Sequence, residues 1–97
     1  MRIPLIQSVE TAVRVFYAYP QLGNKQIREL FGRIGDARCV GLKRIAFDLM
    51  DERGIMHYND VVVNTDAAYE AWGLDIAELE KRLKKTRQFG LNKEAET

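Results

Sequence analysis

Residues 24–49 read NKQIRELFGRIGDARCVGLKRIAFDL and contain two amphipathic helical patterns that meet across a short turn. In the first pattern the apolar residues share one helical face, and they are Ile27, Leu30 and Phe31. Asn24 can cap the start of this helix, and Gly32 is suited to end it because glycine adopts left-handed backbone without a steric penalty. We therefore predict a short helix between Asn24 and Gly32.

The second pattern predicts a longer helix from about Ala37 to about Glu52, with Gly54 just past its end and Asp36 as its cap. Its apolar stripe repeats at i, i+3, i+7 and i+10 and consists of Cys39, Leu42, Ala46 and Leu49. Another face of the same helix carries Arg38, Gly41, Arg44 and Asp48. The helix is therefore expected to bury one side and to present basic residues on another.

Two helices joined by a tight turn form a helix-turn-helix, the motif with which many small domains lay one helix in the major groove of DNA. The turn Gly32-Arg33-Ile34 is one residue longer than is typical of bacterial examples, in which the inward apolar residue follows the glycine directly. Arg28 also occupies the position in the first helix where alanine is usual. Both departures argue against the tight motif and are compatible with a looser, homeodomain-like variant, and a plain helical bundle is the alternative.

The first half of a recognition helix faces the base edges, which makes the candidate base contacts Ala37, Arg38, Val40, Gly41 and Arg44. Arg38 and Arg44 could bond guanine O6 and N7, and Val40 could meet a thymine methyl group. Candidate phosphate contacts position a protein without reading sequence, and here they are Lys25, Arg28, Arg33 and Lys43. For each of these charges, a solvated surface position is the alternative.

The remaining segments complete an all-α bundle of about five helices, homeodomain-like or winged-helix-like, in a single domain over residues 1–91. Capping residues and apolar spacing predict three more helices: from Ser8 to before Pro20, over Ala67–Trp72 after a cap at Asp66 or Thr65, and from Asp75 to about Phe89. Tyr69 and Trp72 should anchor the second of these to the core. Residues 92–97 are predicted to be a disordered tail.

A β-prone segment over residues 55–63 separates the third helix from the fourth. We predict a short extended strip across the helices. Ile55–Tyr58 and Val61–Val63 could instead pair as a hairpin, the wing of a winged helix, but two runs this short are marginal as an isolated hairpin.

Charge is segregated along the chain although the formal net charge is only +1. Residues 1–47 carry eight Lys/Arg against three Asp/Glu, residues 48–80 carry one against nine, and residues 81–97 carry six against two. Binding to a polyanion depends on the local field of a surface patch rather than on net charge. The basic segments therefore favour a nucleic-acid partner, provided that they map onto surface faces.

The last predicted helix carries Ile76, Leu79 and Leu83 at the spacing of a short coiled-coil seam. Its flanking charges change from acidic to basic along its length, which suits the helix dipole and also an antiparallel homodimer. We weigh a homodimer through this seam against packing of the helix on its own domain, which is slightly favoured. The basic end could also contact DNA phosphates.

Catalytic and cofactor chemistry find no support in the sequence. One cysteine, Cys39, and one histidine, His57, do not make a metal-ligand set, and no Walker-type loop, GxGxxG or GxSxG motif occurs. We therefore expect no enzyme activity, no metal and no cofactor. Because no apolar run approaches the roughly 20 residues of a membrane span and the first residues lack a signal-peptide core, we expect a cytoplasmic protein without a membrane partner.

The stretch VNTDAAYEAWGLDIAELEKRL (Val63–Leu83), following a helix-turn-helix, resembles small DNA-binding proteins of phages and prophages of Gram-positive bacteria. In that group the recognition helix is followed by an extended strip, a short helix with Tyr and Trp, and a charged last helix. Here the pattern is matched by Tyr69, Trp72, Gly73 and Asp75.

The resemblance implies binding of double-stranded DNA, most simply by a transcriptional regulator. A DNA-packaging protein similar to a terminase small subunit, or a recombination accessory, is the alternative within DNA binding. A non-catalytic protein–protein adaptor, assembled through the acidic middle and the basic end of the chain, is the alternative from another class. The target sequence, the sign of regulation and the oligomeric state stay open at this point.

Overall fold

The computed structural model describes the backbone of residues 2–95 and the side chains of residues 2–88. Within this part of the chain the elements follow in the order α1 (Val9–Ala18), β1 (Gln21–Leu22), α2 (Asn24–Phe31), α3 (Asp36–Arg53), β2 (Val63–Asn64), α4 (Thr65–Ala71) and α5 (Ile76–Ala95). The predicted all-α class is confirmed as a mainly helical chain with five described helices, to which a small two-stranded sheet is added. None of the described helices combines the length and the apolar character that a membrane crossing requires.

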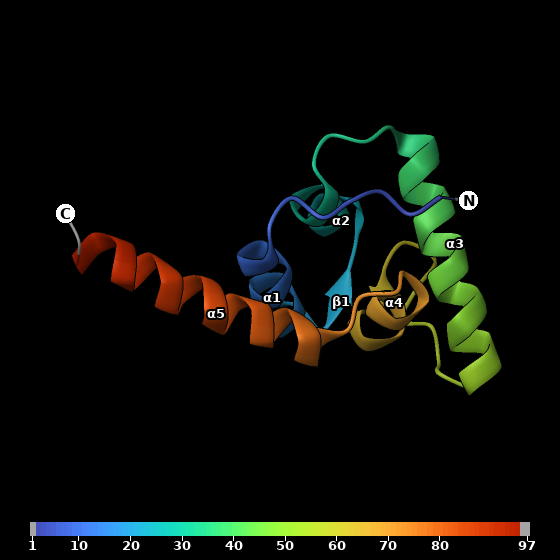
Figure 1. Ribbon diagram of the computed structural model, residues 1–97. Coiled ribbons are helices and arrows are strands. Elements are labelled where there is room, and N and C mark those ends of the chain that lie inside the picture. The colour runs from blue at the N-terminus through green and yellow to red at the C-terminus, as the bar shows by residue number, and fades with distance from the viewer. Residues whose placement is uncertain (1, 96–97) are drawn as a thin grey trace.

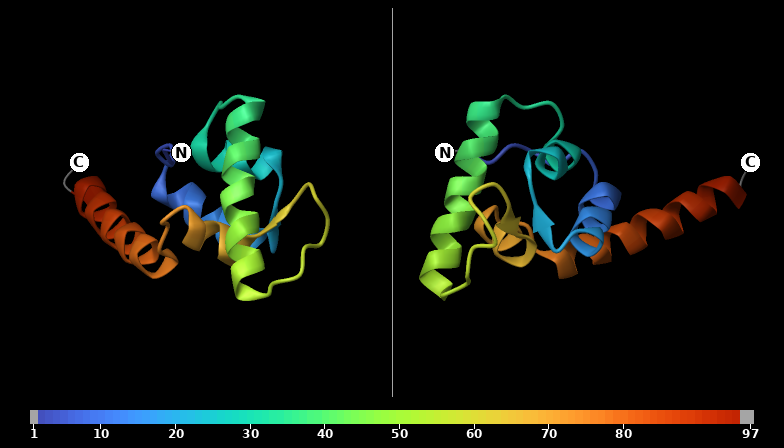
Figure 2. Two further views of the ribbon diagram at one scale, coloured as in Figure 1. Left: turned by 90° about the vertical axis from the view of Figure 1, so that its right-hand side faces the viewer. Right: turned by 180° about the vertical axis from the view of Figure 1, so that it is seen from behind.

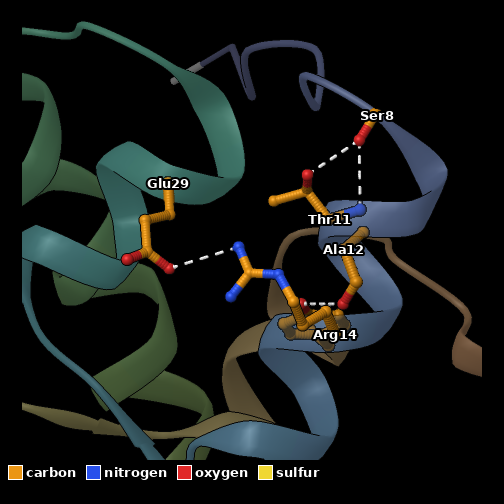
Figure 3. Close-up of polar contacts among 6 residues, drawn as sticks. Ser8, Thr11, Ala12, Arg14 and Glu29 are labelled. Atoms are coloured by element: carbon orange, nitrogen blue, oxygen red, sulfur yellow. Dashed lines mark hydrogen bonds and ion pairs between the residues drawn. The ribbon is translucent and has the colours of Figure 1, made fainter.

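α1 forms where the sequence predicted it, because both of its ends carry local signals. The Ser8 hydroxyl accepts the Thr11 amide proton at 3.0 Å and caps the first turn (Figure 3). Pro20 follows two residues after the helix ends, and its ring prevents the helix from continuing. On the surface, Arg14 of α1 forms a 3.7 Å ion pair with Glu29 of α2 (Figure 3). The two helices are thus joined at the surface as well as through the core.

The two strands join distant parts of the chain. β1 and β2 run antiparallel, and Leu22 pairs with Val63. The predicted extended strip is therefore confirmed only in its last residue. The alternative hairpin between Ile55–Tyr58 and Val61–Val63 is not formed in the described chain, because β2 pairs with the strand that precedes α2.

α4 is held to the core by two aromatic residues, as the sequence predicted. Tyr69 and Trp72 are 2% and 3% exposed. Each satisfies its polar atom, since the Tyr69 hydroxyl donates to the Ala12 carbonyl at 2.6 Å and Trp72 Nε1 donates to the Leu42 carbonyl at 2.9 Å. The Trp72 ring also meets Phe31 edge-on, with ring centroids 5.4 Å apart. α4 therefore ties α1, α2 and α3 into one core.

Three predicted helix caps are replaced by neighbouring residues. Gly23 is the N-cap of α2, and Asn24, which was predicted to be the cap, is the first residue of the helix. Gly35 is the N-cap of α3, and Asp36, which was predicted to be the cap, is the first residue of the helix. α4 is capped by Asn64 instead of Asp66 or Thr65. All three capping residues have extended backbones, so each helix starts one or two residues earlier than the sequence indicated.

α5 begins where the sequence predicted and runs further. Asp75 Oδ1 accepts two backbone amide protons of the first turn, at 3.0 and 3.3 Å, so the predicted cap is confirmed. The helix reaches Ala95 instead of ending near Phe89. It thereby includes residues 92–95 of the predicted tail, while residues 96–97 lie outside the described part of the chain.

The start of α5 packs on its own domain. Leu79 is only 8% exposed, and Ile76 is partly buried against the same core, because α5 lies along α1 at this end (Figure 1). Leu83 is partly buried as well. These three residues therefore pack on their own domain, which is the alternative that the sequence slightly favoured over an open homodimer seam.

The protein should unfold more easily at alkaline pH. Burial raises the pKa of Tyr69 above its ordinary value of 10.0, so the folded protein keeps a proton that the unfolded chain releases. This contribution to stability is complete below the unfolded pKa and is lost as the pH rises toward the folded pKa, by up to about 1.4 kcal/mol per pH unit. Urea unfolding followed by circular dichroism, from about pH 8 to about pH 11, measures the loss. The Tyr69→Phe protein should lose less stability over this range, and an equal loss in both proteins would contradict the prediction.

Candidate nucleic-acid interface

α2 and α3 cross steeply and are joined by a short turn. Figure 1 shows α2 almost along its axis while α3 is seen lengthwise. The turn consists of residues 32–35, and its first residue, Gly32, has a positive φ of 88°. A Cβ atom at Gly32 would lie 2.2 Å from Gln7 Nε2, which itself donates to the Phe31 carbonyl at 3.1 Å. Glycine at this position therefore permits both the backbone conformation and the close approach of the N-terminal segment.

α3 divides cleanly into a buried and an open side. The residues on its buried side include Cys39, Leu42, Ala46 and Met50, of which the first three belong to the predicted stripe. Leu49, the fourth residue of that stripe, is partly buried. In the left view of Figure 2, α3 lies in front and no other described element crosses it. The N-terminal half of the open side of α3 is thus available to a partner.

The five predicted base contacts lie on the first half of this open side, and we call them the outer strip: Ala37, Arg38, Val40, Gly41 and Arg44. Ala37, Arg38 and Arg44 are exposed, Val40 is 48% exposed, and Gly41 is partly exposed. Among the side chains that the structure describes, neither arginine has a carboxylate within ion-pair distance. The outer strip therefore presents two basic groups that the domain itself does not neutralise.

The charge of α3 reverses along its open side. The outer strip is followed by Asp48, Asp51 and Glu52, all of which are exposed. Only the N-terminal half of the helix, where the helix dipole is also positive, attracts a polyanion. The electrostatics thus distinguish one end of the helix from the other.

Of the four predicted phosphate contacts, Lys25 and Arg33 are exposed, at the start of α2 and in the turn. Arg28 is used within the domain instead. Its Nε donates to the Ile34 carbonyl at 3.2 Å, and its guanidinium forms an ion pair with Asp36. Arg28 therefore holds the turn against the start of α3, and its charge is shared with a carboxylate.

Lys43 does not lie on the open side, and its prediction as a phosphate contact is corrected. Its side chain is 9% exposed, and Nζ donates to the Val61 carbonyl at 3.2 Å. The position is three and four residues from Ala46 and Cys39, so helical spacing already placed it at the edge of the buried stripe. The prediction from sequence relied on the positive charge of Lys43 and not on its place on the helix. Lys43 fastens the following loop to α3.

The loop of residues 54–62 lies beside the open side of α3 (Figure 2, left). Besides the Lys43 bond, His57 fastens it, because the His57 ring packs 4.6 Å from the Phe47 ring and Nε2 lies 2.8 Å from Asp51 Oδ1. Three apolar side chains of the loop are largely exposed: Met56 at 90%, Tyr58 at 75% and Val61 at 60%. The site predicted from sequence did not include these three residues, although the β-prone pattern predicted an extended segment here.

Metal chemistry has no site in the part of the chain whose side chains are described, where no group of three or more potential ligands gathers. Cys39, on the buried face of α3, is fully enclosed and behaves there as a small apolar residue. No protein-family model, curated protein or solved structure matches the chain.

Proposed function

We propose that the protein binds double-stranded DNA by placing the N-terminal half of α3 in the major groove, with α2 as the bracing helix of a helix-turn-helix. The observation that carries the proposal is the outer strip. Among the described side chains, Arg38 and Arg44 are exposed and have no carboxylate partner, on a helix whose other side is buried. A helix that is uncovered on one side and basic at its N-terminal half fits the width and the charge of the major groove.

The spacing of the two arginines suits base contacts. Arg44 follows Arg38 by six positions, which corresponds to about 9 Å along a helix and to nearly three base-pair steps of about 3.4 Å. Both side chains could then reach guanines within one short site. Lys25 and Arg33 flank the strip from α2 and from the turn, where they would contact phosphates.

A regulatory role in a phage or prophage is the simplest biological setting, and its support is the resemblance of residues 63–83 to that group. A packaging or recombination accessory would use the same α3 surface. An adaptor is the second candidate, and one observation favours it: the exposed apolar side chains of Met56, Tyr58 and Val61 lie together on one loop beside α3, as in surfaces that bind other proteins.

A titration with labelled genomic duplex fragments, followed by fluorescence anisotropy at low and moderate salt, tests the proposal. With two phosphate contacts, from Lys25 and Arg33, the slope of log K against log salt should be about −2. Amide shifts in a parallel NMR titration should concentrate on residues 36–44. No binding at low salt, affinity that does not depend on salt, or shifts that spare residues 36–44 would overturn the proposal. Shifts confined to the loop of residues 54–62 on addition of a protein partner would favour the adaptor.

A further inference from the structure

α5 leaves the body of the molecule after its first turns. Leu79 is buried, the Tyr17 hydroxyl donates to Glu80, and Leu83 borders a groove with Val13 of α1. The bond to Glu80 raises the pKa of the Tyr17 hydroxyl. Beyond Leu83 the described side chains are exposed, and Figure 1 shows α5 projecting past α1.

The projecting segment is basic on most of its surface. Residues 81–88, which we call the arm, read KRLKKTRQ and carry five bases and no acid. The five bases, all exposed, are Lys81, Arg82, Lys84, Lys85 and Arg87. At 100° per residue these bases occupy most of the circumference of the helix, and three of them, Lys81, Lys84 and Arg87, border the same groove as Leu83. Another of the bases, Arg82, lies 3.7 Å from Glu78 in an exposed ion pair, which neutralises little of the field.

The like charges of the arm repel one another in the folded protein. Like charges three and four residues apart repel one another on a helix, as between Lys81, Lys84 and Lys85. The favourable effect of the helix dipole on bases is confined to the last turn. Because α5 continues to Ala95, the arm lies more than a turn away from that end. A polyanionic partner would turn this repulsion into attraction.

The arm and the outer strip face opposite ways. Figure 1 and the right view of Figure 2 both show α5 leaving the body on the side away from α3, and the molecule is 50 Å long in its longest dimension. A duplex on the open side of α3 has the body of the domain between itself and the arm. Phosphates that reach the arm therefore belong to another segment of nucleic acid.

We propose that the arm binds the phosphate backbone of a second duplex segment, so that one molecule bridges two segments of DNA. The bridging rests on the proposed function of α3, whereas the affinity of the arm for phosphates does not. The basic side chains of the arm would contact phosphates and would not read base edges, so this second contact should be independent of DNA sequence.

A bead capture assay tests the bridging. A biotinylated duplex is fixed to beads, the protein is added, and retention of a second, fluorescent duplex is measured at about physiological salt. Lys84→Gln/Lys85→Gln should reduce retention of the second duplex by roughly tenfold or more, since each lost phosphate contact costs about fivefold under these conditions. Arg14→Gln/Arg53→Gln is the matched control, because it removes two exposed charges outside both surfaces and should leave retention unchanged.

The outcomes separate the two proposals. If the arm variant retains the second duplex as well as the wild-type protein does, the bridging is wrong while binding through α3 stands. If Arg38→Ala/Arg44→Ala leaves anisotropy unchanged and the arm variant abolishes it, the proposed function is wrong and the arm is the primary DNA contact. Sedimentation of the free proteins completes the test. If the wild-type protein is a dimer and the arm variant is a monomer, a second copy of the chain, and not DNA, occupies the arm.

Discussion

Trp72→Ala should lower the free energy of unfolding by about 3–5 kcal/mol, the range for removing a large buried aromatic side chain. Trp72 is 3% exposed, contacts the Phe31 ring and donates to the Leu42 carbonyl. The substitution therefore opens a cavity between α2, α3 and α4 and also removes a buried hydrogen bond. A domain of this size has about 5–15 kcal/mol of stability in total, so the variant should be largely unfolded when warmed.

Urea unfolding followed by circular dichroism measures this effect, because the substitution removes the tryptophan fluorescence. Tyr58→Ala is the matched control: it also deletes an aromatic ring, but one that is 75% exposed, and it should change stability by less than about 0.5 kcal/mol. A loss below about 1 kcal/mol for Trp72→Ala would show that Trp72 does not link the helices as described.

Arg38→Ala/Arg44→Ala should weaken binding to the preferred duplex by about 2–6 kcal/mol, since each base-contacting arginine contributes about 1–3 kcal/mol. Both side chains are exposed and lack carboxylate partners among the described side chains, so the stability of the fold should change little. Anisotropy titrations against the preferred duplex and a scrambled one measure the effect, and the loss should be larger for the preferred duplex.

The pair Arg14→Ala/Arg53→Ala controls for charge alone. These arginines are similarly exposed, but they form ion pairs with Glu29 and Glu70 away from the outer strip. An equal loss of affinity in both double variants would mean that binding follows net charge and that α3 has no special role.

Local signals predicted the helices well. Ser8, Pro20, Gly32 and Gly54 mark helix ends through backbone chemistry that acts over a few residues, and the structure places α1, α2 and α3 within one or two residues of the predicted bounds. The apolar spacing of α3 likewise indicated which side is buried, because that spacing reflects the helix alone.

Features that depend on distant residues were not predictable in this way. The pairing of β1 with β2 joins residues about forty positions apart. Lys43 is buried because Val61, eighteen residues away, offers a carbonyl to its ammonium group. Arg28 was predicted to contact a phosphate. No local pattern indicates that it bonds instead to Ile34 and Asp36 across the turn. Of the predicted site residues, Lys43 is therefore buried and Arg28 bonds within the fold, while Arg38 and Arg44 are exposed as predicted.

The hydrogen bond from Trp72 to the Leu42 carbonyl affects when the domain can fold during synthesis. α3 is complete in the chain at Arg53, but the strand and the indole that pack against it come later, at Val63 and Trp72. A nascent chain that stops at Gly54 has the whole outer strip and lacks the support behind it. The domain should therefore gain its function all at once, when α4 joins the core, and an α2–α3 fragment should be inert.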